Sequence, residues 1–190
     1  MLPSRVVLGL GNPGEEYAGT RHNIGFQVVE SLARSLDIRL SERRWMSRHG
    51  VGVLAGENTA FLLPETFMNR SGQVLDLLRA DCPDFDVSRN LIVVYDDLDL
   101  PCGQVRLKAS GGAGGHKGMA SLIATAGSRD IPRLRFGVGR PPEGGEVIDF
   151  VLSLFSPDEV AVLPACIKEA RRAIEHFAEF GVDSAMNHFN

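Results

Sequence analysis

The chain has 190 residues and a formal net charge of −4 at pH 7, with 44% hydrophobic and 23% charged residues. This balance is typical of a globular domain and excludes a disordered or collagen-like chain. The apolar runs are far shorter than the about 20 residues that a membrane-spanning helix needs. The apolar stretch near the N-terminus is also too short for a signal peptide.

Short apolar runs alternate with amphipathic stretches along the chain. The first half predicts a buried strand over 5–10, a helix with an apolar stripe from Ile24 to Leu36 capped by Asn23, a hairpin of strands 51–56 and 59–64 around Glu57-Asn58, and a helix over 66–79. The second half predicts strands over 91–97, 104–110 and 134–139, a helix over 116–126, and a helix from Ser156 to Gly181 with a break near Pro164. This alternation predicts one α/β domain over residues 1–190, with helices on both faces of one sheet.

The basic residues are concentrated in one segment. Residues 101–140 carry seven Lys or Arg and one acid, a net charge of +6, which leaves −10 on the rest of the chain. Such a segment can bind a polyanion locally or form a solvated surface, and charge alone does not choose between them. The three cysteines, Cys82, Cys102 and Cys166, are too few and too far apart for a disulfide framework or a metal cluster. We therefore expect a cytoplasmic protein.

The first strand ends in a glycine-rich turn that matches G-x-G-x-x-G over residues 9–14. A dinucleotide-binding fingerprint requires the last glycine to open a helix. Here a polar stretch intervenes, and Pro13 favours an extended conformation at Asn12, so a nucleotide cofactor is disfavoured. Either the glycines make a tight turn, or the turn presents the Asn12 amide at the end of the strand, where ligands bind in open α/β sheets.

Ionisable side chains follow at two further element ends. Asp96 and Asp97 end the apolar strand, and His22 precedes the first helix. A histidine or an aspartate that stands alone is more often a structural or solvated residue. As a pair, however, His22 can act as a base near neutral pH and Asp96 can orient it. Because no nucleophile motif occurs, the simplest chemistry is His-assisted attack by water.

Neutral amides complete this candidate site. Asn12 and Asn69 offer contacts to an ester or its oxyanion, and His116 follows the glycine loop at a helix start. No metal-ligand spacing such as H-E-x-x-H occurs. We therefore expect neither a metal nor another cofactor.

Six stretches of unusual polar sequence run from one end of the chain to the other. They are GLGNPGEEYAGTRHNIGF (9–26), PETFMNRSG (64–72), VVYDDLDLPCGQVRLKASGGAGGHKG (93–118), RLRFGVGRP (133–141), DFVLSLFSPDE (149–159) and AMNHFN (185–190). In this order and spacing, the chain resembles the bacterial peptidyl-tRNA hydrolase family. The resemblance implies a monomeric, metal-independent esterase that cuts a peptide from the 3′ ribose of tRNA. It also implies one domain with a mixed, mainly parallel sheet.

The resemblance also assigns roles to residues of this chain. It implies that His22 is the catalytic base, that Asp96 orients it and that Asn12 positions water. The substrate-binding residues that it implies are Tyr17, Met68, Asn69, His116 and Lys117, with Lys108 and Arg135 as contacts for tRNA phosphate.

The chain departs from the family pattern at Lys117, where the family motif reads GHNG. Lys117 cannot accept a hydrogen bond and adds a full charge, so it can bind a phosphate, stabilise an oxyanion or impair substrate positioning. Lys117 and the acidic residues Glu143 and Glu146 favour an alternative in which the chain binds RNA but has no hydrolase activity. Such relatives include the chloroplast intron-splicing factors. A third alternative is a hydrolase of small esters or nucleosides.

Overall fold

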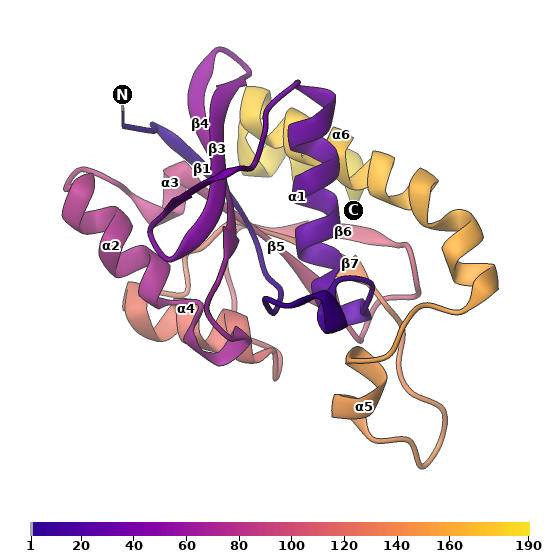
Figure 1. Ribbon diagram of the computed structural model, residues 1–190. Helices are drawn as coiled ribbons and strands as arrows, with labels where there is room; N and C mark the ends of the chain where they lie inside the picture. Colours follow the sequence, from indigo (N-terminus) through magenta and orange to yellow (C-terminus); the bar gives the residue numbers. More distant parts are fainter. Residues whose placement is uncertain (1) are drawn as a thin grey trace.

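The computed structural model describes residues 2–190, which form one seven-stranded sheet with helices on both faces (Figure 1). The strand order is β2-β3-β4-β1-β5-β7-β6. Neighbouring strands are parallel from β4 to β7, whereas β2, β3 and β6 join as antiparallel pairs at the two edges. The strands are β1 (Arg5–Gly9), β2 (Glu42–Arg44), β3 (Ser47–Leu54), β4 (Glu57–Pro64), β5 (Leu91–Asp97), β6 (Val105–Lys108) and β7 (Arg133–Gly137). This confirms the predicted mixed, mainly parallel α/β fold.

Two layers of helices bury the sheet from both sides. The first core contains the apolar faces of α1 (Ile24–Ser35) and α6 (Pro157–Phe189), and the second contains those of α2 (Gln73–Asp81), α3 (Val87–Asn90) and α4 (Lys117–Ala126). The central strands β1 and β5 are apolar on both faces because both faces are covered. The short helix α5 (Val147–Val151) stands apart from these layers at one end of the molecule (Figure 1).

Several predicted boundaries were wrong. The β3–β4 turn is at Ala55-Gly56, two residues before the predicted position, and both residues have positive φ. The predicted helix over 66–79 divides into a 3-10 turn, η3 (Met68–Arg70), and α2. The last helix continues through Pro164 without the predicted break. Its helical backbone is interrupted at Gly181, the predicted end, where φ is 83°, and a second helical stretch follows. Local composition did not predict β2, α3 or α5.

The glycines of the first turn allow close packing at the end of β1. A Cβ atom at Gly9 would lie 2.4 Å from the carbonyl oxygen of Gly25, and one at Gly25 would lie 2.4 Å from that of Val94. Side chains at these positions would push α1 away from β1 and β5. The glycines therefore bring the start of α1 against the carboxyl ends of both strands.

Candidate active site

A cavity of about 830 Å³ opens at the carboxyl ends of β1 and β5. Its lining includes the end of β5, the start of α4, and apolar side chains of α5 and the residue after it. It also includes basic residues of β6, β7 and the start of α4. The cavity therefore combines apolar, cationic and neutral polar side chains.

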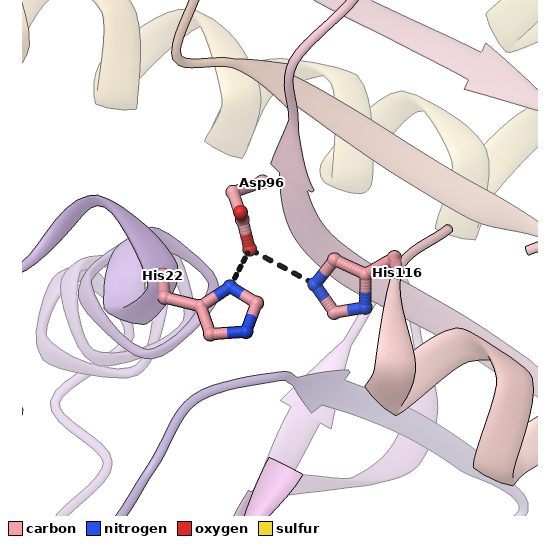
Figure 2. Close-up of side chains that lie close together, drawn as sticks. All are labelled: His22, Asp96 and His116. Atoms are coloured by element: carbon pink, nitrogen blue, oxygen red, sulfur yellow. Dashed lines mark hydrogen bonds and ion pairs between the residues drawn. The ribbon is translucent and has the colours of Figure 1, made fainter. Parts of the chain in front are cut away.

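Two histidines contact one oxygen of a buried carboxylate in this cavity (Figure 2). Nδ1 of His22 lies 2.8 Å from Oδ1 of Asp96, and Nε2 of His116 lies 2.9 Å from the same oxygen. Burial raises the pKa of the Asp96 carboxyl, but its interactions with His116 and His22 outweigh burial, so its pKa lies well below the ordinary value. Asp96 is therefore an ionised acceptor at neutral pH and not a solvated turn residue.

His22 lies in η2 (Arg21–Asn23), the 3-10 turn that leads into α1. Its Nδ1 faces Asp96, and its Nε2 has no hydrogen-bond partner within residues 2–190. Because ionised Asp96 can only accept, Nδ1 of His22 carries the proton of that hydrogen bond. The lone pair of a neutral His22 is therefore on Nε2, the atom that is free to accept a proton.

Asn12 uses half of its amide to hold the site together. Its Oδ1 accepts a hydrogen bond from the backbone N–H of Met68 at 2.9 Å. The side chain of Asn23 bonds the backbone N–H and carbonyl of Asn12, both at 2.9 Å. We predicted that Asn23 caps α1, but its side chain makes no capping hydrogen bond there. It instead holds the backbone of the turn at Asn12. The Nδ2 donors of Asn12 have no partner within residues 2–190 and remain available to a ligand.

The other predicted substrate-binding residues also line the cavity, with the exception of Tyr17. Met68 is buried in the cavity wall, and Asn69 beside it is exposed. Tyr17 lies in η1 (Glu15–Tyr17) and is absent from the cavity lining, and its carbonyl oxygen accepts hydrogen bonds from Thr20. The structure does not bring Tyr17 to the other candidates.

The cationic residues divide into paired and unpaired groups. Arg135 lies 2.5 Å from Asp97, and Arg140 pairs with Asp99. The buried guanidinium of Arg133 donates to three backbone carbonyls. In contrast, Arg70, Lys108 and Lys117 line the cavity, are exposed, and form no ion pair with any residue from 2 to 190. Their charges are the ones most available to an anionic ligand.

The whole chain is similar to known proteins of one kind. The family model for peptidyl-tRNA hydrolase matches residues 6–190. The chain belongs to the peptidyl-tRNA hydrolase family. It is 44% identical over 185 residues to the peptidyl-tRNA hydrolase of Chloroflexus aggregans, covering 97% of this chain and 98% of that one. It is 46% identical to that of Syntrophomonas wolfei, covering 98% and 100% of the two chains. The crystal structure of the Acinetobacter baumannii peptidyl-tRNA hydrolase superposes with a TM-score of 0.89 at 34% identity, covering 100% of this chain and 96% of that one.

Two groups of cavity residues in this member of the peptidyl-tRNA hydrolase family were not predicted from the sequence. Arg70 follows Asn69 in the cavity lining, and the apolar lining residues are Val147, Ile148, Val151 and Leu152. Val147 and Ile148 are 44% and 58% exposed. Exposed apolar residues beside a glycine-rich loop were the available signal, but their position depends on how the long connection between β7 and α6 folds back.

His22, Asp96 and His116 also offer metal-ligand atoms within 4.8 Å of one another. However, the nitrogen–oxygen distances of 2.8 and 2.9 Å are those of hydrogen bonds. The other nitrogen of His116 accepts a hydrogen bond from the Met119 backbone. Each side chain therefore already has a partner that accounts for its orientation.

An ion pair anchors the turn that carries His22. The guanidinium of Arg21 donates two hydrogen bonds to the carboxylate of Glu159 at the start of α6, at 2.8 and 2.7 Å. It also lies over the rings of Phe150 and Phe155, 4.4 and 4.9 Å from their centroids. The hydrogen bonds from Arg21 lower the pKa of Glu159 to about 2. The backbone next to His22 is thus fixed to a helix outside the cavity.

We expect Glu159→Gln to lower the free energy of unfolding by about 2 kcal/mol at pH 7, because it leaves a buried guanidinium without its ionic partner. Glutamine retains the capping-box geometry at this position. Since the folded-state pKa lies below the ordinary 4.5, ionised Glu159 stabilises the fold above about pH 4.5 and loses this effect as the pH falls toward 2. Urea unfolding of both proteins should show the difference narrowing from pH 4.5 to 3.

The matched control is Glu169→Gln on the same helix, which removes an exposed pair with Arg172. Exposed pairs contribute little, so this variant should unfold with nearly the wild-type free energy at every pH. A Glu159→Gln difference that stayed constant down to pH 3 would contradict the assigned ion pair.

Proposed function

We propose that the protein is a peptidyl-tRNA hydrolase. It cleaves the ester bond between the C-terminal carboxyl of a peptide and the 3′-terminal ribose of tRNA, and so recycles tRNA from prematurely released peptidyl-tRNA. The observation that carries the proposal is His22 held by buried Asp96, with Nε2 unpartnered at the cavity, in a chain of this family. The protein acts as a monomer in the cytoplasm, where its substrate is made. Across residues 2–190, no helix is long and apolar enough to span a membrane.

The proposed reaction uses water as nucleophile. Nε2 of His22 accepts a proton from a water molecule while its oxygen attacks the ester carbonyl carbon. The hydrogen bond from Nδ1 to Asp96 stabilises the imidazolium that forms. The Nδ2 donors of Asn12 stabilise the negative charge on the carbonyl oxygen. The intermediate breaks its bond to the ribose 3′ oxygen, which takes the proton from His22. The products are tRNA with a free 3′ hydroxyl and a peptide carboxylic acid, which releases its proton to solvent and leaves as the carboxylate.

The apolar and the cationic residues of the cavity lining suit the two parts of this substrate. The apolar side chains of α5 suit peptide side chains, because burying them removes apolar surface from water. The unpaired cations Lys108 and Lys117 suit the tRNA phosphates. Arg135 contributes to phosphate binding while remaining bonded to Asp97, which fixes its guanidinium in place. In this proposal Met68 and Asn69 line the path of the peptide end, and Tyr17 serves the substrate from outside the cavity lining.

We expect Lys108→Gln to weaken tRNA binding and to reduce the slope of log K against log salt concentration by about one, because one phosphate contact is lost. Binding measured at several salt concentrations checks this result. Lys168→Gln removes an exposed charge from α6, away from the cavity lining, and should keep the wild-type slope. If both variants behaved alike, Lys108 would not contact phosphate.

The proposal is tested by hydrolysis of an N-acetylated aminoacyl-tRNA, with unblocked aminoacyl-tRNA and a small N-acetylated amino acid ester as controls, each with and without a transition-metal chelator. We expect rapid release from the blocked tRNA in both conditions and much slower release from both controls. Equal rates on the small ester would favour a general esterase. Binding of tRNA without release would favour an RNA-binding relative.

A further inference from the structure

His116 makes one hydrogen bond at each ring nitrogen. It is the N-cap residue of α4, where Nδ1 accepts a hydrogen bond from the backbone N–H of Met119 at 3.2 Å. Its Nε2 lies 2.9 Å from Oδ1 of Asp96, and its side chain is only 7% exposed. Both of its polar atoms are therefore occupied by protein groups and not by substrate.

The two partners determine which nitrogen of His116 carries the proton. A backbone N–H can only donate, so Nδ1 must be an acceptor. The proton of the neutral ring is then on Nε2, which donates to Asp96. A second proton on Nδ1 would break the cap and place a positive charge at the N-terminus of a ten-residue helix, beside Lys117. His116 is thus suited to donate to Asp96 and not to accept a proton.

Asp96 consequently receives two N–H donors at one oxygen, from His22 and from His116 (Figure 2). A carboxylate next to a histidine favours the protonated imidazolium. A second donor on the same oxygen satisfies part of that negative charge, so Asp96 favours protonated His22 less than a carboxylate with one partner would. It also fixes the position of the oxygen that orients His22.

We infer that His116 is a positioning residue, held as its Nε2–H tautomer by the start of α4, which orients Asp96 and keeps His22 available as a base at lower pH. This inference deepens the role of His22 and rests on the proposed function. It differs from the role expected from sequence, in which His116 contacts substrate.

The other charged groups around the two histidines are not altered when His116 is substituted. On the elements packed against η2 and α4, the charged and titratable groups include Arg21 with Glu159, Asp97 with Arg135, Tyr95, Lys117 and Asp149. They also include Arg70 of η3 and Asp76, Arg79 and Asp81 of α2. The helix α1 carries charges only from Glu30 onward. The ring of Tyr95 meets His116 edge-on, with the centroids 4.8 Å apart.

The test replaces His116 by asparagine, a good N-cap residue that is too short to keep the hydrogen bond to Asp96. We expect a lower rate at every pH, with the greater loss at acidic pH. The ratio of kcat/KM at pH 8.5 to that at pH 6 should rise about tenfold, which corresponds to a shift of about one unit in the acidic limb. The control Ser121→Ala removes the hydrogen bond from Gly72 to α4 and should leave this ratio unchanged. An unchanged ratio in His116→Asn would overturn the inference.

Nitrogen-15 NMR of histidine-labelled protein gives a readout that needs neither activity nor a variant. We expect the proton of His116 on Nε2 and that of His22 on Nδ1 near pH 8; a proton on Nδ1 of His116 would overturn the inference. If the wild type hydrolysed no ester, the proposed function would fail. The inference about His116 would still be tested by the NMR titration of His22. A higher midpoint in His116→Asn than in the wild type supports the inference, and equal midpoints refute it.

Discussion

Replacing His22 by alanine should lower kcat for ester hydrolysis by about 10²–10⁴-fold, the range that a general base contributes. The remaining rate would come from binding and from the amide donors around the ester. The substitution should leave the fold intact, because His22 is in a short turn at the cavity and Arg21 still anchors that turn to α6. Single-turnover release from N-acetylated aminoacyl-tRNA measures the loss.

His176→Ala is the matched control, because His176 is on α6 and outside the cavity lining. It should hydrolyse the substrate at the wild-type rate. The wild-type rate should also rise with pH as His22 loses its proton, whereas the residual rate of His22→Ala should lack this dependence. Wild-type activity in His22→Ala would exclude this residue as the base.

The second large effect is expected for Asp96→Asn. We predict a loss of about 10²–10⁴-fold in kcat, because the neutral amide no longer stabilises the imidazolium. If the amide turns its NH₂ toward His22, it also forces the proton of His22 onto Nε2, the atom that must accept one. Kinetics should show the loss mainly in kcat, since Asp96 is buried and its side chain contacts His22 and His116.

The control for Asp96→Asn is Asp99→Asn, which removes an exposed carboxylate that follows the same strand and pairs with Arg140. We expect a far smaller loss, and mainly in KM. A comparable loss in kcat for both variants would mean that the general charge of the cavity matters and not the specific contact with His22.

The sequence predicted the elements that bring His22 and Asp96 together because their signals are local. The apolar run over 91–97 predicts β5 directly, and a polar residue at its end faces the ligand side of a parallel sheet. His22 precedes an amphipathic stripe that predicts α1. The order of the elements thus predicted that His22 and Asp96 lie together. In the structure, Nδ1 of His22 lies 2.8 Å from Oδ1 of Asp96.

Contacts made by residues distant in sequence were beyond such reasoning. The unoccupied half of the Asn12 amide depends on the backbone of Met68, 56 positions away. The neutralisation of Arg135 by Asp97 depends on the pairing of β5 with β7. The donor role of His116 depends on its place as the cap of α4, which periodicity locates only to within a few residues. In each case tertiary packing decides which atoms remain free for chemistry.

The central claim is that water, activated at His22, attacks the carbonyl carbon of the peptide ester. Hydrolysis of N-acetylated aminoacyl-tRNA in H₂¹⁸O, followed by mass spectrometry of both products, tests it most directly. We predict one ¹⁸O atom in the carboxylate of the released N-acetyl amino acid and none in the 3′ hydroxyl of the tRNA. Label in the ribose hydroxyl, or no release of the N-acetyl amino acid, would contradict the account.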